Sequence, residues 1–106
     1  MPATPEFAGA LVVEVADSSM EPTLRPGARV LVTPVPAADW PFMPSGIYCL
    51  AYRTTFAIKR LKDNTLLQSS LLLLHADNPS GGAYPVRGDD LRAVWHVRWA
   101  VFMPLT

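Results

Sequence analysis

The chain has 106 residues, half of them hydrophobic, which is enough for one folded domain and excludes both a disordered chain and a repeat array. Nine basic and nine acidic residues leave no net charge, which argues against a surface that binds nucleic-acid phosphates. No apolar run approaches the roughly 20 residues of a membrane span, and the N-terminus lacks the pattern of a secretory signal. We therefore expect one cytoplasmic domain over residues 1–106, in which the single cysteine, Cys49, forms no internal disulfide.

Eleven prolines and six glycines interrupt the chain too often for a long helix, so the predicted elements are mostly short strands. A single helical turn is expected near residues 21–23 and another at Leu91, whereas residues 34–46 are expected to form a loop and residues 62–64 a turn. In chain order, the expected strands are residues 11–15, 28–33, 47–52, 55–61, 65–68 and 71–75, a short edge strand from Val86, and residues 93–103.

The last expected strand has an unusual apolar face. Period-two alternation places Trp95, Val97, Trp99 and Val101 on one side of it. We expect this face to contribute to a homodimer.

Three motifs follow one another along the chain. The first is Ser19-Met20, followed by Glu-Pro-Thr and then by Pro-Gly before an apolar strand. The second is Lys59-Arg60 after apolar residues, 40 residues downstream of Ser19, and the third is an apolar strand that runs into Asp77-Asn78-Pro. In this order, the motifs resemble the LexA-like serine-lysine peptidase domains, which include the C-terminal domains of LexA and phage CI-type repressors and the UmuD-like proteins.

This resemblance covers residues 11–102 and implies a fold and an activity. The fold is mostly β, a LexA/signal-peptidase-like β-clip of short strands with at most one or two short helical turns. The implied activity is self-cleavage of a peptide bond by a Ser19/Lys59 dyad, in the peptidase and dimerisation domain of a transcriptional repressor. The substrate is then a peptide arm of the same chain or of a partner chain, and no cofactor or metal takes part.

The resemblance also implies partners. In this family a RecA-type filament promotes self-cleavage during the SOS response to DNA damage. DNA is bound through an N-terminal helix-turn-helix segment, and these residues contain no such segment.

Chemistry also explains, independently of the resemblance, why a serine such as Ser19 would need a lysine such as Lys59. A serine hydroxyl is a poor nucleophile near neutral pH, and a buried, neutral lysine can act as its base. Lys59 stands among Phe56, Ile58 and Leu61, so an apolar setting is expected. Backbone amides of Ser19 and Met20, with Ser18 as a neighbour, are the expected donors to the oxyanion.

The chain departs from the family pattern just before the nucleophile. The family commonly has Gly-Asp before the serine, whereas this chain has Asp17-Ser18, and Met20 fixes the register on Ser19. Family members often cut an Ala-Gly bond, and the one Ala-Gly step here, Ala8-Gly9, lies so close to Ser19 that intramolecular cleavage is expected to be cramped.

Two alternatives remain open from the sequence. One is a non-catalytic dimerisation module with an idle dyad, and the other is a signal-peptidase-related protease, which shares the Ser-Met and Lys-Arg steps but normally has a membrane anchor. His75 and His96 are interpreted as structural, and one cysteine with two separated histidines does not match a metal-site spacing. Asp77 and Asn78 are interpreted first as turn residues and only second as residues that border a substrate groove.

Overall fold

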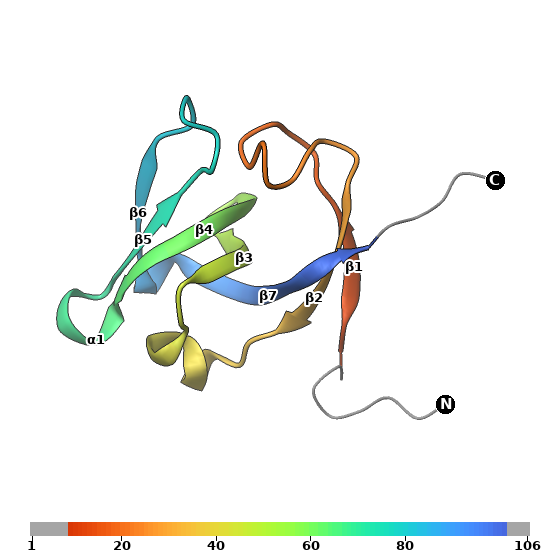
Figure 1. Cartoon of the computed structure of the whole chain (residues 1–106). Helices are drawn as coiled ribbons and strands as arrows, with labels where there is room; N and C mark the ends of the chain where they lie inside the picture. The colour runs from red at the N-terminus through yellow and green to blue at the C-terminus, as the bar shows by residue number, and fades with distance from the viewer. Residues whose placement is uncertain (1–8, 102–106) are drawn as a thin grey trace.

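The computed structural model describes residues 9–101, which form a seven-stranded antiparallel sheet in the order β1-β2-β7-β3-β4-β5-β6. Figure 1 shows β7 running across the middle of the molecule, with the β1–β2 and β5–β6 loops both above it at the top of the view. The strands are β1 Leu11–Glu14, β2 Arg29–Pro34, β3 Gly46–Tyr52, β4 Thr55–Thr65, β5 Leu71–His75, β6 Ala83–Arg87 and β7 Leu91–Val101. The helical segments are η2 Ala37–Phe42, α1 Leu66–Ser69 and η3 Gly88–Asp90.

A mostly β fold with only short helical turns is therefore confirmed, but residues 9–101 contain three such segments rather than at most one or two. The expected loop over residues 34–46 contains the short helix η2, and the turn at Leu91 lies just before that residue, in η3. The segment around residues 21–23 forms turns rather than a helix. Residues 102 and 103 of the expected last strand lie outside the described residues.

The expected turn at residues 62–64 and strand at residues 65–68 are wrong. β4 continues to Thr65 with a register shift between Leu61 and Asp63, and α1 follows directly. Asn64 explains the change, because its Nδ2 donates to the carbonyl oxygens of Trp40 and Met43 at 2.7 and 3.3 Å. These bonds hold the end of β4 against η2, a contact that no local pattern reveals.

The core consists of two clusters of buried side chains. The first includes Tyr48, Leu50, Leu61, Leu72 and Leu74, all at most 1% exposed. The second joins the β1–β2 loop to strands β2, β3 and β4; its members are Val15, Met20, Leu24, Val30, Val32, Cys49 and Ile58. Burial raises the pKa of the Cys49 thiol to about 12, so this thiol stays protonated at neutral pH.

The single apolar face predicted for the last strand is wrong beyond Val97. A register shift pairs Val32 with Val97 but Leu31 with Trp99. Since directly opposed residues share a face, Trp99 lies on the face of Leu31, opposite to that of Val97. Trp95 and Val97 pack against the second cluster, and Trp99 is 49% exposed.

Candidate active site

The fold brings Ser19 and Lys59 into contact. The Lys59 Nζ donates a hydrogen bond to the Ser19 Oγ at 2.8 Å. Ser19 is half-buried in the β1–β2 loop, and Lys59 lies on β4 with 9% of its surface exposed. This distance is within the reach that a nucleophile and its base require.

Aromatic rings lie next to the lysine. The Lys59 Nζ is 5.7 Å from the ring centroid of Tyr84, on β6, and the β3–β4 register places Tyr48 directly opposite Lys59. Tyr48 is 1% exposed. With 9% of its surface exposed, Lys59 is mostly buried where it meets Ser19, and serine-lysine chemistry needs a buried lysine.

Buried side chains on either side of Ser19 anchor its loop. Val15, before the serine, is 2% exposed, and Met20, after it, is fully buried. Both belong to the second core cluster, which therefore holds the loop on either side of Ser19. Two backbone hydrogen bonds close it, from the Val15 amide to the Ala28 carbonyl at 2.8 Å and from the Leu24 amide to the Met20 carbonyl at 2.9 Å. Because Met20 points into the core, its neighbour Ser19 can face Lys59.

One of the amides expected to stabilise the oxyanion is already paired. The Ser19 amide donates to Asp17 Oδ1 at 3.0 Å. This hydrogen bond, followed by contact with the Ser19 hydroxyl and the charge of Lys59, holds the pKa of Asp17 below its usual value. Ser18 is exposed and Met20 buried; among residues 9–101, no hydrogen bond from either amide is found.

Asn78 connects the β5–β6 loop to the backbone around Ser19. Its backbone amide donates to the Ser19 carbonyl at 2.9 Å, and its Nδ2 donates to the Ser18 carbonyl at 3.0 Å. Its Oδ1 accepts from the amide and hydroxyl of Ser80 at 3.1 and 2.8 Å, which is the expected turn chemistry. Asn78 thus forms a turn and also fixes the backbone of the serine loop.

Asp77 connects the same loop to β4. Its carboxylate accepts two hydrogen bonds from Arg60, at 2.7 and 2.8 Å, and one from the Thr23 hydroxyl at 2.5 Å. The bonds from Arg60 are the main reason that the pKa of Asp77 lies below its usual value. Sequence reasoning missed this pair, although the arginine next to Lys59 in the Lys-Arg step was a signal for an acidic partner.

We expect Asp77→Asn to lower the free energy of unfolding by roughly 1–3 kcal/mol at neutral pH, because a bidentate charge-assisted pair is lost. The folded-state pKa is depressed, so the contribution is present above the unfolded value of about 3.9 and is lost as pH falls through the folded value. Denaturant unfolding from about pH 7 towards pH 2 checks this. The gap between wild type and variant should close in acid, whereas the exposed Asp63→Asn control should show no gap at any pH.

A small cavity borders the serine loop, and neither Ser19 nor Lys59 lines it. Its volume is about 60 Å³, and its lining comes from the end of β1, the serine loop and the start of β4: Glu14, Val15, Ala16, Asp17, Met20, Phe56, Ala57 and Ile58. Its size and mostly apolar lining suit a small apolar side chain.

The first half of β4 has one free edge next to this cavity. β3 pairs with β4 from Thr55 to Leu61, whereas β5 pairs with it only from Arg60 onward. Among residues 9–101, no strand pairs with the other edge of residues 55–59. An extended peptide could add there by main-chain hydrogen bonds.

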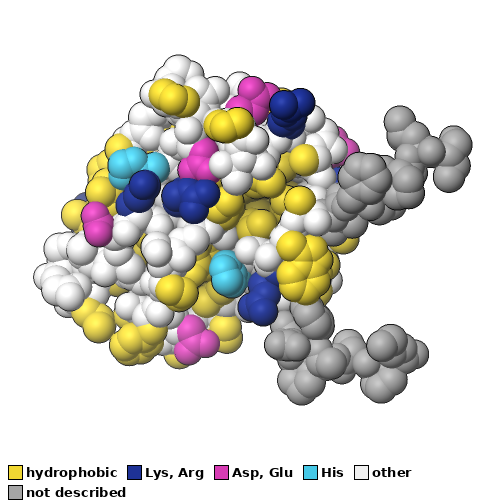
Figure 2. Space-filling view, in the orientation of Figure 1, with side chains coloured by type: hydrophobic (Ala, Val, Ile, Leu, Met, Phe, Trp, Pro, Cys, Tyr) yellow, Lys and Arg dark blue, Asp and Glu magenta, His cyan; other side chains and the backbone are white. Residues whose placement is uncertain are grey.

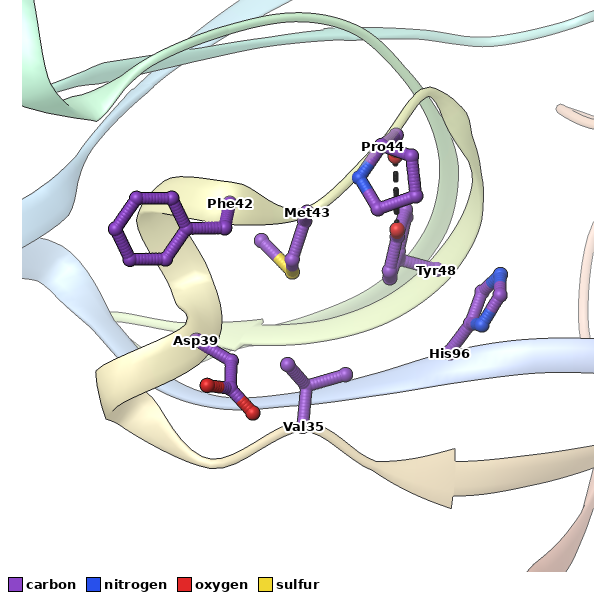
Figure 3. A pocket seen from close by; sticks show the side chains of 7 residues that line it. All are labelled: Val35, Asp39, Phe42, Met43, Pro44, Tyr48 and His96. Atoms are coloured by element: carbon purple, nitrogen blue, oxygen red, sulfur yellow. Dashed lines mark hydrogen bonds between the residues drawn. The ribbon is translucent and has the colours of Figure 1, made fainter. Parts of the chain in front are cut away.

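A larger cavity, of about 280 Å³, lies between η2, β3 and β7 (Figure 3). His96 borders it and stacks on Tyr48 with ring centroids 4.8 Å apart, and burial followed by the charge of Arg98 lowers the pKa of His96. His75 pairs with Arg60 in the β4–β5 register. In the described part of the chain, no hydrogen bond joins either histidine to Ser19.

On the face in Figure 2, basic and acidic side chains are interspersed rather than gathered in a field of one sign. Within residues 9–101, no cluster of three or more metal-ligating side chains occurs. None of the helices there has the length and apolar character to cross a bilayer.

Comparison of the chain with protein-family models, with curated proteins and with solved structures finds no match. The function is therefore inferred from the geometry of the site together with the three sequence motifs.

Proposed function

We propose that this domain is a LexA-like serine peptidase in which Ser19 is the nucleophile and Lys59 the general base. The observation that carries the proposal is the 2.8 Å hydrogen bond between Lys59 Nζ and Ser19 Oγ, formed by residues 40 positions apart. In this proposal, the domain cleaves a peptide arm of its own chain or of a partner, as the peptidase and dimerisation part of a transcriptional repressor. The β-clip form of the fold, the cytoplasmic location and the RecA-type inducer belong to the same proposal.

The reaction follows acyl-transfer chemistry. Neutral Lys59 takes the proton of the Ser19 hydroxyl while the oxygen attacks the substrate carbonyl carbon. The carbon-nitrogen bond then breaks, and the lysine ammonium returns that proton to the leaving amine. A water molecule, deprotonated by Lys59, hydrolyses the resulting ester and regenerates the serine.

Two features beside the dyad support a peptide substrate. The free edge of residues 55–59 can pair with an extended arm, and the 60 Å³ cavity between Ala57 and Met20 has room for an alanine side chain. Both fit an Ala-Gly scissile bond. Ala8 of the Ala8-Gly9 step lies outside the described residues, and the exposed Gly9 precedes β1.

The proposal is tested by cleavage in trans. A peptide with a central Ala-Gly bond is incubated with the purified domain at several alkaline pH values, and products are identified by mass spectrometry. Cleavage at that bond by wild type, and not by a Ser19→Ala variant, is the expected result. Absence of any product from pH 7 to pH 10 would instead support a dimerisation module with an idle dyad.

We still expect a homodimer, but through a surface that β1, β2 and β7 share rather than through one face of β7 alone. Strand register aligns Val12, Leu31 and Trp99 in one row across β1, β2 and β7, and Val12 and Trp99 are 56% and 49% exposed. We expect sedimentation of a dimer at tens of micromolar, about the range in which weak interfaces dissociate. Val12→Lys should yield monomers, whereas Leu67→Lys, at an exposed apolar residue away from this row, should not; a wild-type monomer at that concentration would contradict the prediction.

A further inference from the structure

The residue before Ser18 stands where the resembled family commonly has glycine, and here it is an aspartate that folds back onto the nucleophile. Asp17 Oδ1 accepts the hydrogen bond of the Ser19 amide at 3.0 Å. The contact with the Ser19 hydroxyl and the charge of Lys59 also favour its ionised form, so a carboxylate stands at the dyad at neutral pH. A glycine at this position would leave the amide open.

The same side chain borders the cavity proposed above for a substrate side chain. Asp17 lines the 60 Å³ cavity together with Met20 and Ala57. A carbonyl attacked by Ser19 must come within bonding distance of the Ser19 Oγ. Its oxygen then develops negative charge close to this carboxylate.

Two physical effects of this arrangement oppose the reaction. An amide that already donates to a carboxylate is not free to donate to an oxyanion, and an oxyanion donor contributes a large part of acyl-transfer catalysis. The carboxylate also repels the developing charge, and this repulsion grows as a bound peptide excludes water.

We propose that Asp17 is an autoinhibitory residue that occupies the Ser19 amide in the resting enzyme and must turn away before the oxyanion forms. This inference rests on the proposed peptidase function and adds a control to it. The Asp17 side chain is exposed, so it can rotate toward solvent without disturbing the core. An arm that fills the cavity beside it would favour that rotation, which links binding of the arm to activation.

Other charged groups near the site do not compete for this role. Glu14 lines the cavity but is 63% exposed and lies 3.9 Å from Arg29, and Asp77 is held by Arg60 and Thr23. Asp17 is the carboxylate that accepts from the nucleophile's own amide.

Two substitutions separate the hydrogen bond from the charge. Asp17→Ala removes both, and Asp17→Asn keeps an acceptor for the amide but no charge. We expect Asp17→Ala to raise the turnover of an Ala-Gly peptide about tenfold, and Asp17→Asn to raise it by less. The exposed Asp63→Ala, which changes net charge equally, should leave turnover unchanged.

An inhibitor gives a readout that a purely structural role would not move. A tripeptide aldehyde ending in alaninal forms a tetrahedral adduct with a serine, and the oxygen of this adduct needs the same amide. Its inhibition constant should fall in Asp17→Ala by about the factor by which turnover rises. Equal or slower turnover in a folded Asp17→Ala, with an unchanged inhibition constant, would overturn the inference, and slower turnover would indicate that Asp17 supports the nucleophile.

The amide itself can be observed without catalysis. The Ser19 amide proton resonance should move as Asp17 titrates in acid, and this movement should be absent in both Asp17 variants. A Ser19 amide that does not follow Asp17 would refute the occupancy even if the enzyme is active. Turnover that persists in an Asp17→Ala/Ser19→Ala double variant would instead refute the proposed function, so the two failures are distinguishable.

Discussion

Replacement of Ser19 by alanine is expected to lower the rate of peptide cleavage at least about a thousandfold while the domain stays folded. The hydroxyl is the proposed nucleophile, and its loss removes only one oxygen from a half-buried position. Lys59→Ala should be equally damaging, because nucleophile and base act as one unit. Rates of Ala-Gly peptide cleavage, together with thermal unfolding curves, check both variants.

The adjacent serine is the matched control. Ser18 is exposed, and its carbonyl rather than its hydroxyl is used to hold the loop, through Asn78 Nδ2. Ser18→Ala should therefore retain activity. Full activity in Ser19→Ala would refute the dyad hypothesis. Loss of activity in Ser18→Ala alone would identify Ser18 as the nucleophile instead.

The second large effect is expected from pH. The neutral fraction of a simple amine, whose pKa is about 10.4, rises tenfold with each pH unit below that value. If Lys59 must be neutral to accept the serine proton, the cleavage rate should climb with pH over several units and then level off. Single-turnover rates between about pH 6 and pH 11 provide the measurement.

Two further results would test whether Lys59 is the base behind this dependence of the cleavage rate on pH. Lys59→Arg should be as inactive as Lys59→Ala, since a guanidinium stays protonated throughout the range. A profile that peaks near neutral pH and falls in alkali would point to a histidine base. That outcome would return attention to His75 and His96, although neither is hydrogen-bonded to Ser19 within the described residues.

The sequence predicts much of this fold because alternation and turn residues are local signals. Strands β1, β3 and β5 lie close to their expected positions. The errors lie where a contact distant in sequence determines the local structure. Asn64 donates to the carbonyls of Trp40 and Met43, and α1 begins two residues later where a strand was expected. The register shift that turns Trp99 away from Val97 likewise depends on β2.

The candidate site likewise contains features that the sequence predicts and features that it does not. Ser19 and Lys59 were predicted from their motifs, and the structure places them in contact. The second role of Asn78 and the pairing of Asp17 with the Ser19 amide were not predicted, because both depend on how a loop folds back. Residue types alone do not specify such geometry.

The connections around Ser19 also have a consequence for folding kinetics. The contacts that assemble the site join residues 40, 54 and 60 positions apart, from Ser19 to Lys59, from Thr23 to Asp77 and from Ser18 to Asn78. Such long loops are slow to close and form only when most of the sheet is in place. A nascent or partly unfolded chain therefore has a serine and a lysine but no dyad, and under the proposed function it could not cut itself before its fold is complete.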